Sequence, residues 1–315
     1  MVLSLLLACA PDSVGALSDQ CADCHATQAD ALAASTLSRE APTALFTALQ
    51  AQAAALHGPS AAAQCDACHA PVVGHQGGLS CASCHAAVGH RAPENGALIH
   101  ELWGPVLGTE SLSSPAHRVQ SSVFLGDPAL CGTCHELQGP AALSETPYTH
   151  WRDSPAAQDG VGCADCHMPQ GDHSFPGLNG DRDTALSLLR EAAELERIPG
   201  GVRLHNRNPG HALPDGAAFT RRLVLQWRLD GQVLGEHSLT PSYRDGQGEE
   251  IHSPLAAAAH QDNSIPAGQS RDFFPPSEVT PAQACLVFQQ QDPARLAERG
   301  RPAAGGVGEV GCLGW

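Results

Sequence analysis

Lysine is absent from this sequence, so all 17 basic residues are arginines. Methionine and aromatic residues are scarce too: there are two Met, and Phe, Trp and Tyr make up 4% of the chain. The apolar run Leu3–Ala8 is too short to span a bilayer. Hydrophobic residues amount to 42%, which is enough for a globular core. Since aromatic side chains usually fill such cores, their scarcity indicates that something else occupies the space.

Positive charge is also in short supply. The formal net charge is −16, which argues against nucleic-acid binding, because affinity for phosphate depends on basic patches. An acidic surface suits docking to a basic partner, and it equally suits simple solubility.

The N-terminal residues resemble a bacterial export signal. Residues 6–9, Leu-Leu-Ala-Cys, are similar to a bacterial lipobox, and we expect residues 1–17 to be a signal or lipoprotein-like leader. Lipidated Cys9 would then tether the protein to a membrane. The usual basic segment is missing, since the first positive side chain is Arg39, so an upstream start or a frayed apolar tail stays open.

Ten of the 13 cysteines form five Cys-x-x-Cys pairs, and histidine directly follows every pair. Thiols three residues apart lie on one side of a helical turn, where they can bond to the two vinyl groups of one haem. The next residue can turn its imidazole to the iron. The predicted attachment residues are Cys21, Cys24, Cys65, Cys68, Cys81, Cys84, Cys131, Cys134, Cys163 and Cys166, and the predicted proximal ligands are His25, His69, His85, His135 and His167.

Zinc knuckles and redox dithiols also use Cys-x-x-Cys, so a single motif would decide little. Histidine makes up 17 of 315 residues, and the chance of it following all five pairs is about 10⁻⁶. We therefore expect five covalently bound haems c. Because bacteria attach haem outside the cytoplasm, the motifs also predict a periplasmic or outer-surface protein.

The distal ligands follow by elimination. Met1 belongs to the leader and Met168 is held beside the proximal His167, so the distal positions must be filled mostly by histidine, or be vacant. Bis-His ligation gives low potentials. Surface or supporting roles stay open for each candidate, and we favour His150 less. The candidates are His57, His90, His100, His117 and His173, with His75 and His211 in reserve.

The chain divides into a haem region and a β-rich region. We expect residues 18–180 to form a mostly helical or irregular domain that wraps five haems, with an Ala-rich helical stretch over 28–57 broken near Pro42. The second and third motifs are close in sequence, which predicts neighbouring haems. The pattern of 183–197 predicts one helix in a linker over 181–200.

A small β-sandwich-like domain is expected over 201–315. Asp230-Gly231 is a hairpin signal between two strands, and Cys285 and Cys312 could form a disulfide or stay as free thiols. The predicted strands are 202–206, 222–229, 232–239, 270–274 and 284–291.

The block Trp151-x-x-Ser154 followed by Gly160-Val-x-Cys163-x-x-Cys166-His167-Met168-Pro169 resembles bacterial multihaem cytochromes c. This broad group includes the tetrahaem cytochrome c-554-like electron acceptor of hydroxylamine oxidoreductase. The segment 208–216 is similar to a Gly-His-x-x-Pro-x-Gly signature in the β-rich module of some members. The resemblance implies a helical domain of closely packed bis-His haems with an extracytoplasmic redox role.

Three functions remain open. The first is electron transfer, without enzyme activity, to redox partners such as a quinol oxidase module or other cytochromes. The second is a reductase or oxidase of a small nitrogen or sulfur oxyanion at one open haem. A Cys-x-x-Cys-Lys version is excluded because lysine is absent, and the first haem is the suspect, since 35–38 lacks the histidine that relatives often place there. The third is partner recognition by 206–216, which is otherwise a strand and a tight turn.

Overall fold

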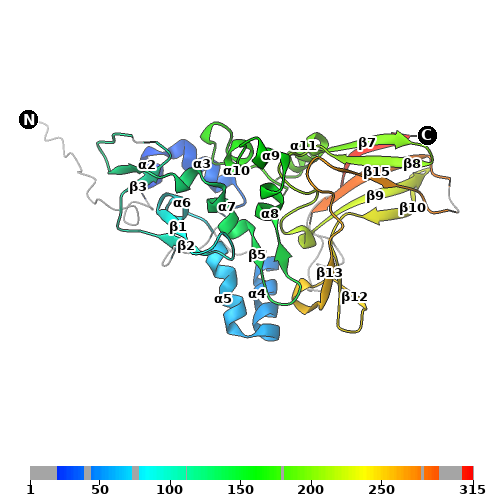
Figure 1. Ribbon diagram of the computed structural model, residues 1–315, viewed down its shortest axis with the longest axis horizontal. Helices are drawn as coiled ribbons and strands as arrows, with labels where there is room; N and C mark the ends of the chain where they lie inside the picture. Colours follow the sequence, from blue (N-terminus) through cyan, green and yellow to red (C-terminus); the bar gives the residue numbers. More distant parts are fainter. Residues whose placement is uncertain are drawn as a thin grey trace, which may run out of the picture.

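The structure, a computed structural model, describes residues 20–38, 44–72, 78–110, 112–178, 181–277, 280–290 and 307–314. The predicted leader with Cys9, the helix break near Pro42 and the reserve ligand His75 lie outside these residues. Helices and short strands occupy one end of an elongated molecule, and two larger sheets occupy the other (Figure 1). Among the described residues, no helix combines the length and the apolar character needed to cross a membrane.

Short helices dominate the haem region, and several begin at a proline, whose fixed φ suits the first helical turn. Asp127 caps one of them by accepting the N–H of Ala129 at 2.8 Å. The helices are α2 (Cys21–Cys24), α3 (Ala26–Ala34), α4 (Ala44–His57), α5 (Pro59–His69), α6 (Cys81–His85), α7 (Pro128–His135), α8 (Pro147–Arg152), α9 (Pro155–Gln158) and α10 (Cys163–His167), with 3₁₀ turns η1 (Phe124–Gly126) and η2 (Pro169–Gly171).

Three two-stranded sheets connect these helices: the antiparallel pairs β1–β2 and β5–β6, and the parallel pair β3–β4. Their strands are β1 (Ala87–His90), β2 (Leu98–His100), β3 (Val106–Gly108), β4 (Val119–Ser121), β5 (Leu137–Gln138) and β6 (Ser144–Glu145). Apolar burial in this part is scattered over small clusters, such as the one formed by Val72, Ala82 and Ala86. The polypeptide thus packs little against itself here, as expected of a chain that wraps a cofactor.

The β-rich part contains two sheets that share one core. A four-stranded sheet has the order β10-β9-β15-β16, and a three-stranded sheet has the order β14-β8-β7. Leu204, Trp227 and Phe288 are fully buried between them, as in a sandwich. The strands are β7 (Ala193–Ile198), β8 (Gly201–Asn206), β9 (Arg221–Leu229), β10 (Gln232–Ser238), β14 (Ser270–Phe273), β15 (Gln283–Gln290) and β16 (Val307–Gly314).

The five predicted strands coincide with β8, β9, β10, β14 and β15 to within one or two residues. Asp230 and Gly231 join β9 to β10 with positive φ values of 48° and 80°, as the hairpin signal predicts. Cys285 and Cys312 lie opposite each other on β15 and β16 and form a disulfide.

The helix predicted over 183–197 is too long. Helix α11 (Arg182–Ala192) ends at Ala192, and the next residues form β7, which pairs with β8. The alternating sequence of 193–198 fits a strand as well as a helix. It forms a strand because its backbone can pair with the otherwise unpaired edge of β8. Leu186 and Leu189 of α11 join the sandwich core, so this helix packs with the β-rich part.

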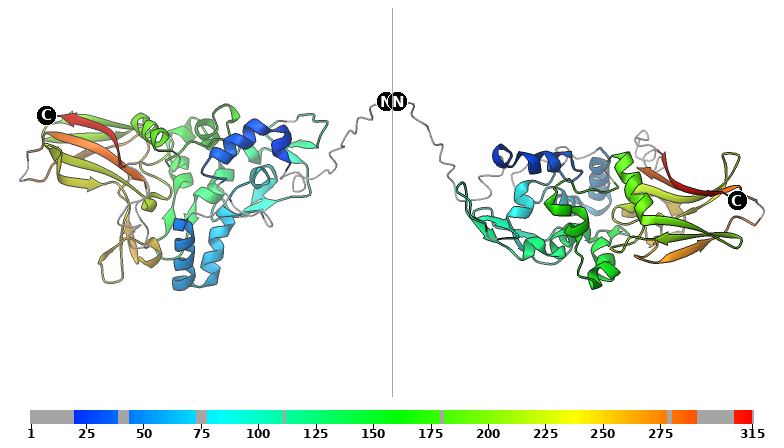
Figure 2. Two further views of the ribbon diagram at one scale, coloured as in Figure 1. Left: turned by 180° about the vertical axis from the view of Figure 1, so that it is seen from behind. Right: turned by 90° about the horizontal axis from the view of Figure 1, so that it is seen from above.

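A second connection between the parts involves the α4–α5 hairpin, which projects from the side of the molecule (Figures 1 and 2). Ala53, Ala61 and Leu255 form one buried cluster, and the Ser253 hydroxyl donates to Gln52 Oε1 at 2.7 Å. On the β-rich side, η4 (Pro254–Ala256) contacts α4, and Leu49 of α4 packs on a cluster that includes Tyr243 of β11 (Ser242–Arg244), with Ile251 of β12 (Glu250–Ile251) beside it. Strand β13 (Ala259–Gln261) pairs with β11, and η3 (Ala218–Thr220) precedes β9.

Candidate functional site

All five Cys-x-x-Cys-His motifs form a helical turn. They make up α2 with its C-cap His25, the last turns of α5 and α7, and the whole of α6 and α10. In each turn the two thiols are three residues apart, and therefore on one side, with histidine at the helix end. This is the local geometry that the haem prediction requires.

The motifs converge in space, although they are spread over the sequence. The thiol of Cys21 lowers the pKa of Cys81 to about 6, which places the first and third motifs in contact. The thiol of Cys134 is the main influence that raises the pKa of Cys68, joining the second and fourth motifs. A cysteine that has formed a thioether no longer titrates. These thiol interactions therefore show only which motifs lie close together.

The fourth motif lies near three of the other four. The Cys163 thiol of the fifth motif raises the pKa of Cys131, and the charges of Cys134 and Cys84 also interact. Neighbouring motifs are therefore first–third, third–fourth, fourth–second and fourth–fifth. The thiol contact of Cys68 with Cys134 brings the second motif to the fourth. That the second and third haems are neighbours, as their short spacing in sequence indicates, stays a prediction.

Three pairs of imidazole rings face each other at one spacing. The ring centroids of His25 and His117 are 6.3 Å apart, as are those of His85 and His173. The pair His167 and His211 repeats the distance, and its planes are inclined by only 14°. Each pair combines a motif histidine with a histidine distant in sequence.

The Nδ1 atoms of five of these six rings are bound to backbone carbonyls. His85 donates to Leu107 O at 2.6 Å and His173 to Gly171 O at 2.8 Å. The remaining contacts are His167 to Pro176 O at 3.0 Å, His211 to Ala212 O at 3.1 Å and His117 to Arg118 O at 3.4 Å. A proton fixed on Nδ1 leaves the lone pair of Nε2 free for a metal.

These residues fit an iron held between two imidazoles. A metal–nitrogen bond is about 2.0 Å and a ring centroid lies about 1.1 Å behind its nitrogen, which gives about 6.2 Å between two axial rings. The observed 6.3 Å agrees with this spacing. Burial also lowers the pKa of His69, His85, His135 and His167, which favours the neutral imidazole that binds metals.

Two proximal candidates differ from the other three. Within the described ranges, no second imidazole faces His69 or His135 at the spacing above. Instead the ring of Phe46 packs against His69 with centroids 4.3 Å apart. The sequence had placed the doubtful coordination at the first motif, but the structure brings His117 to His25. In the part of the chain that the structure describes, it is His69 and His135 that lack a facing histidine at this spacing.

The other predicted distal ligands are in varied surroundings. His57 uses its Nε2 to donate to Leu255 O at 2.6 Å, and His100 uses Nε2 to donate to Ser83 O at 3.0 Å. The Nδ1 atom of His90 is buried without a hydrogen-bond partner, a costly state that a metal would relieve. His150 is hydrogen-bonded through Nδ1 to Asp215 at 2.8 Å.

A buried polar cluster lies between the haem region and the β-rich part. Burial raises the pKa of Glu145 to about 7, with Asp215 raising it further and Arg221 opposing both. Burial likewise lowers the pKa of Arg221, against the attraction of Glu145 and Asp215. The sequence had not singled out Glu145, Asp215 or Arg221 as members of such a cluster. Asp215 falls in the signature-like segment 208–216, and that position was the available signal.

Comparisons with known proteins concern the fold. No protein-family model and no curated protein matches the chain. Among solved structures, the chain is similar to a penta-haem cytochrome c552 from Thermochromatium tepidum, with a TM-score of 0.70 and 17% identity over 95% of this chain and 98% of that chain. The protein therefore has the fold of a multihaem cytochrome, with the helical region and the β-rich module both included in the match.

Proposed function

We propose that this chain is an extracytoplasmic c-type cytochrome that carries electrons through five covalently bound haems. The observation that carries the proposal is the set of three imidazole pairs 6.3 Å apart, each including a motif histidine. Bound haem would supply one-electron iron chemistry, and the chain would attach each haem, ligate its iron and exclude water.

The ligand assignment follows from the ring pairs. His117, His173 and His211 serve as distal ligands opposite His25, His85 and His167. For one of the two remaining irons, His90 is the proposed distal ligand, because its buried Nδ1 has no protein partner. His57 and His100 take structural roles, since their Nε2 atoms hold backbone carbonyls.

The contacts among the motifs support a conducting path. Thiol neighbours connect the first motif to the third, the third to the fourth, and the fourth to both the second and the fifth. Haems attached at these thiols would lie close together, so electrons could pass from one to the next. The partner is proposed to be another redox protein, a cytochrome or a quinol oxidase module, whose basic surface docks on the acidic chain. A lipid tether at Cys9 would keep the chain at a membrane.

The test is to produce the full chain in a host with a haem-attachment system and to count haems by intact mass and by the pyridine haemochrome absorbance. Five haems per chain are expected, and the variant Cys163→Ala/Cys166→Ala should hold four. Zinc in place of haem, or fewer than five haems in the unaltered protein, contradicts the proposal. Reversible stepwise reduction without turnover of a substrate supports electron transfer.

A second function, reduction or oxidation of a small nitrogen or sulfur oxyanion, is favoured by one observation. The described residues place no second imidazole opposite His69 or His135, which would leave an iron open to substrate. Electron paramagnetic resonance of the oxidised protein separates the two functions: a high-spin ferric signal from one haem, with nitrite or sulfite altering it, favours catalysis. Low-spin signals from all five irons favour electron transfer alone.

A further inference from the structure

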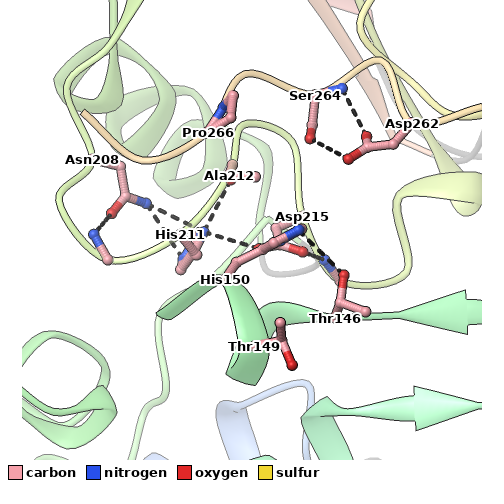
Figure 3. A network of polar contacts seen from close by, with 12 residues as sticks. Thr146, Thr149, His150, Asn208, His211, Ala212, Asp215, Asp262, Ser264 and Pro266 are labelled. Carbon is pink, nitrogen blue, oxygen red and sulfur yellow. Dashed lines mark hydrogen bonds and ion pairs between the residues drawn. The ribbon is translucent and has the colours of Figure 1, made fainter. Parts of the chain in front are cut away.

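The carboxylate of Asp215 lies between two histidines at the junction of the haem region and the β-rich part (Figure 3). Its Oδ2 accepts a hydrogen bond from His150 Nδ1 at 2.8 Å and lies 3.8 Å from His211 Nδ1. The Asp215 side chain is only 7% exposed. A charge in this position is poorly screened by water and acts strongly on its neighbours.

Asp215 is held firmly from several sides. Its Oδ1 accepts the N–H of Gly216 at 2.8 Å, and Arg221 Nη2 donates to its backbone carbonyl at 3.3 Å. His150, which supplies the bond to Oδ2, belongs to α8 of the haem region, and the Thr146 hydroxyl lies 3.3 Å from its Nε2. Both parts of the molecule therefore position this carboxylate.

The neighbouring His211 is held in the orientation that faces the fifth motif. Its Nδ1 donates to Ala212 O at 3.1 Å, and the amide nitrogen of Asn208 lies 3.4 Å from both ring nitrogens. At 3.8 Å the Asp215 oxygen is beyond hydrogen-bond length from Nδ1, so it acts on this ring through its charge. A negative charge behind an axial imidazole increases its basicity and stabilises the ferric iron over the ferrous iron.

We propose that Asp215 is a positioning residue that lowers the reduction potential of the fifth haem through His211. The proposal rests on the proposed function, in which His167 and His211 ligate that iron. The β-rich part would then do more than dock a partner: its loop 207–217 would supply both the distal ligand and the charge that tunes it.

The test uses Asp215→Asn in the haem-loaded full chain, because asparagine keeps the size and one acceptor oxygen but removes the charge. The expected result is that one haem becomes easier to reduce. Its ratio of oxidised to reduced iron at a fixed potential should fall about tenfold. For a one-electron couple this is equivalent to a rise of 59 mV in the reduction potential. The low-spin resonance signals should persist, since the ligands remain.

Two further variants separate tuning from a merely structural role. Asp215→Glu restores the charge and should return the potential towards that of the unaltered protein. Glu196→Gln removes the carboxylate from another histidine contact, that with His205 at 2.8 Å, and should leave all five potentials unchanged. Equal potentials in Asp215→Asn and the unaltered protein, or an equal shift in Glu196→Gln, would overturn the proposal.

Failure of the ligand assignment has a separate signature. His211→Ala should convert one low-spin ferric haem to high spin while the haem count stays at five. If His211→Ala leaves every haem low-spin, then His211 is not a ligand and the tuning proposal falls with the assignment. If His211→Ala gives the high-spin signal but Asp215→Asn shifts nothing, only the role of Asp215 is overturned.

Discussion

Several of the proposed iron ligands differ from other histidines of this chain in which imidazole nitrogen meets a backbone carbonyl. His85 and His173 give their Nδ1 protons to carbonyls and keep Nε2 free. His57 and His100 have the opposite arrangement, with Nε2 bound to a carbonyl. Histidine content alone does not separate these groups, because the difference depends on which nitrogen meets the backbone.

His173→Ala and His100→Ala provide a matched pair. The first should open the iron at His85 and turn one haem in five high-spin, because the facing imidazole is lost. His100→Ala should leave all spin states unchanged, since its Nε2 holds Ser83 O. Electron paramagnetic resonance of both ferric proteins checks this, and a high-spin signal from the His100 variant instead would reverse the two roles.

The pKa of Glu145 predicts a dependence of stability on pH. Burial raises this pKa from 4.5 to about 7 in the folded protein, so between these values the folded state binds more protons than the unfolded state. The free energy of unfolding should therefore fall as pH rises from about 4.5 to 7, by up to roughly 3 kcal/mol, and then level off.

Glu145→Gln isolates this contribution. Glutamine stays neutral, so the variant should lose the part of the pH dependence that Glu145 supplies. Its free energy of unfolding, relative to that of the unaltered protein, should therefore increase towards pH 7. Urea unfolding of both haem-loaded proteins at several pH values measures the difference. Parallel stability curves for the two proteins would mean that Glu145 ionises normally.

Among the elements, β16 is held in place by three kinds of contact. It pairs with β15 over its whole length, and Cys312 is bonded to the fully buried Cys285. Helix α11 covers the same region, with Arg190 donating to the carbonyls of Glu309 and Val310. The terminal strand is thus secured by a covalent bond, by sheet pairing and by a helix from another part of the chain.

Loss of the Cys285–Cys312 disulfide should destabilise the β-rich part. The bond closes a loop with a sequence separation of 27, for which about 2–4 kcal/mol of stabilisation is typical. Cys285→Ala/Cys312→Ala should lower the unfolding temperature in oxidising buffer, while the haem count stays at five. A mild reductant should destabilise the unaltered protein but not the variant. Identical unfolding of the two oxidised proteins would contradict this prediction.

In the molecule as a whole, the order of the motifs in space differs from their order in sequence. The fourth motif contacts the second and the fifth and lies near the third, whereas the first contacts the third. In the proposed cytochrome, the fourth haem would therefore be the junction through which the fifth communicates with the first and third, and the second would be a branch.

Removing single haems tests this arrangement. Cys131→Ala/Cys134→Ala, which lacks the fourth haem, should slow equilibration of electrons between the fifth haem and the rest after pulsed reduction. Cys65→Ala/Cys68→Ala, which lacks the branch, should equilibrate as fast as the unaltered protein. Absorbance changes on the microsecond-to-second range follow both. Equal slowing by the two variants would show that the fourth haem is not the junction.

Several predictions made from the sequence agree with the structure because they rest on local patterns. The motif turns, the strands β8, β9, β10, β14 and β15, and the Asp230-Gly231 hairpin are encoded within a few residues. The helix over 183–197 was predicted too long because its end depends on a contact between segments and not on a local pattern. An alternating segment next to an unpaired strand edge becomes a strand only when that edge is present.

The proposed attachment sites follow from the sequence alone, since two thiols and an imidazole of one helical turn can act together wherever that turn lies in the fold. The pairing of the motif histidines with His117, His173 and His211 does not, because these residues meet only after distant segments have packed. The tertiary structure also decided the order of the motifs and the placement of Asp215, since contacts between remote residues depend on how helices and sheets close around one another.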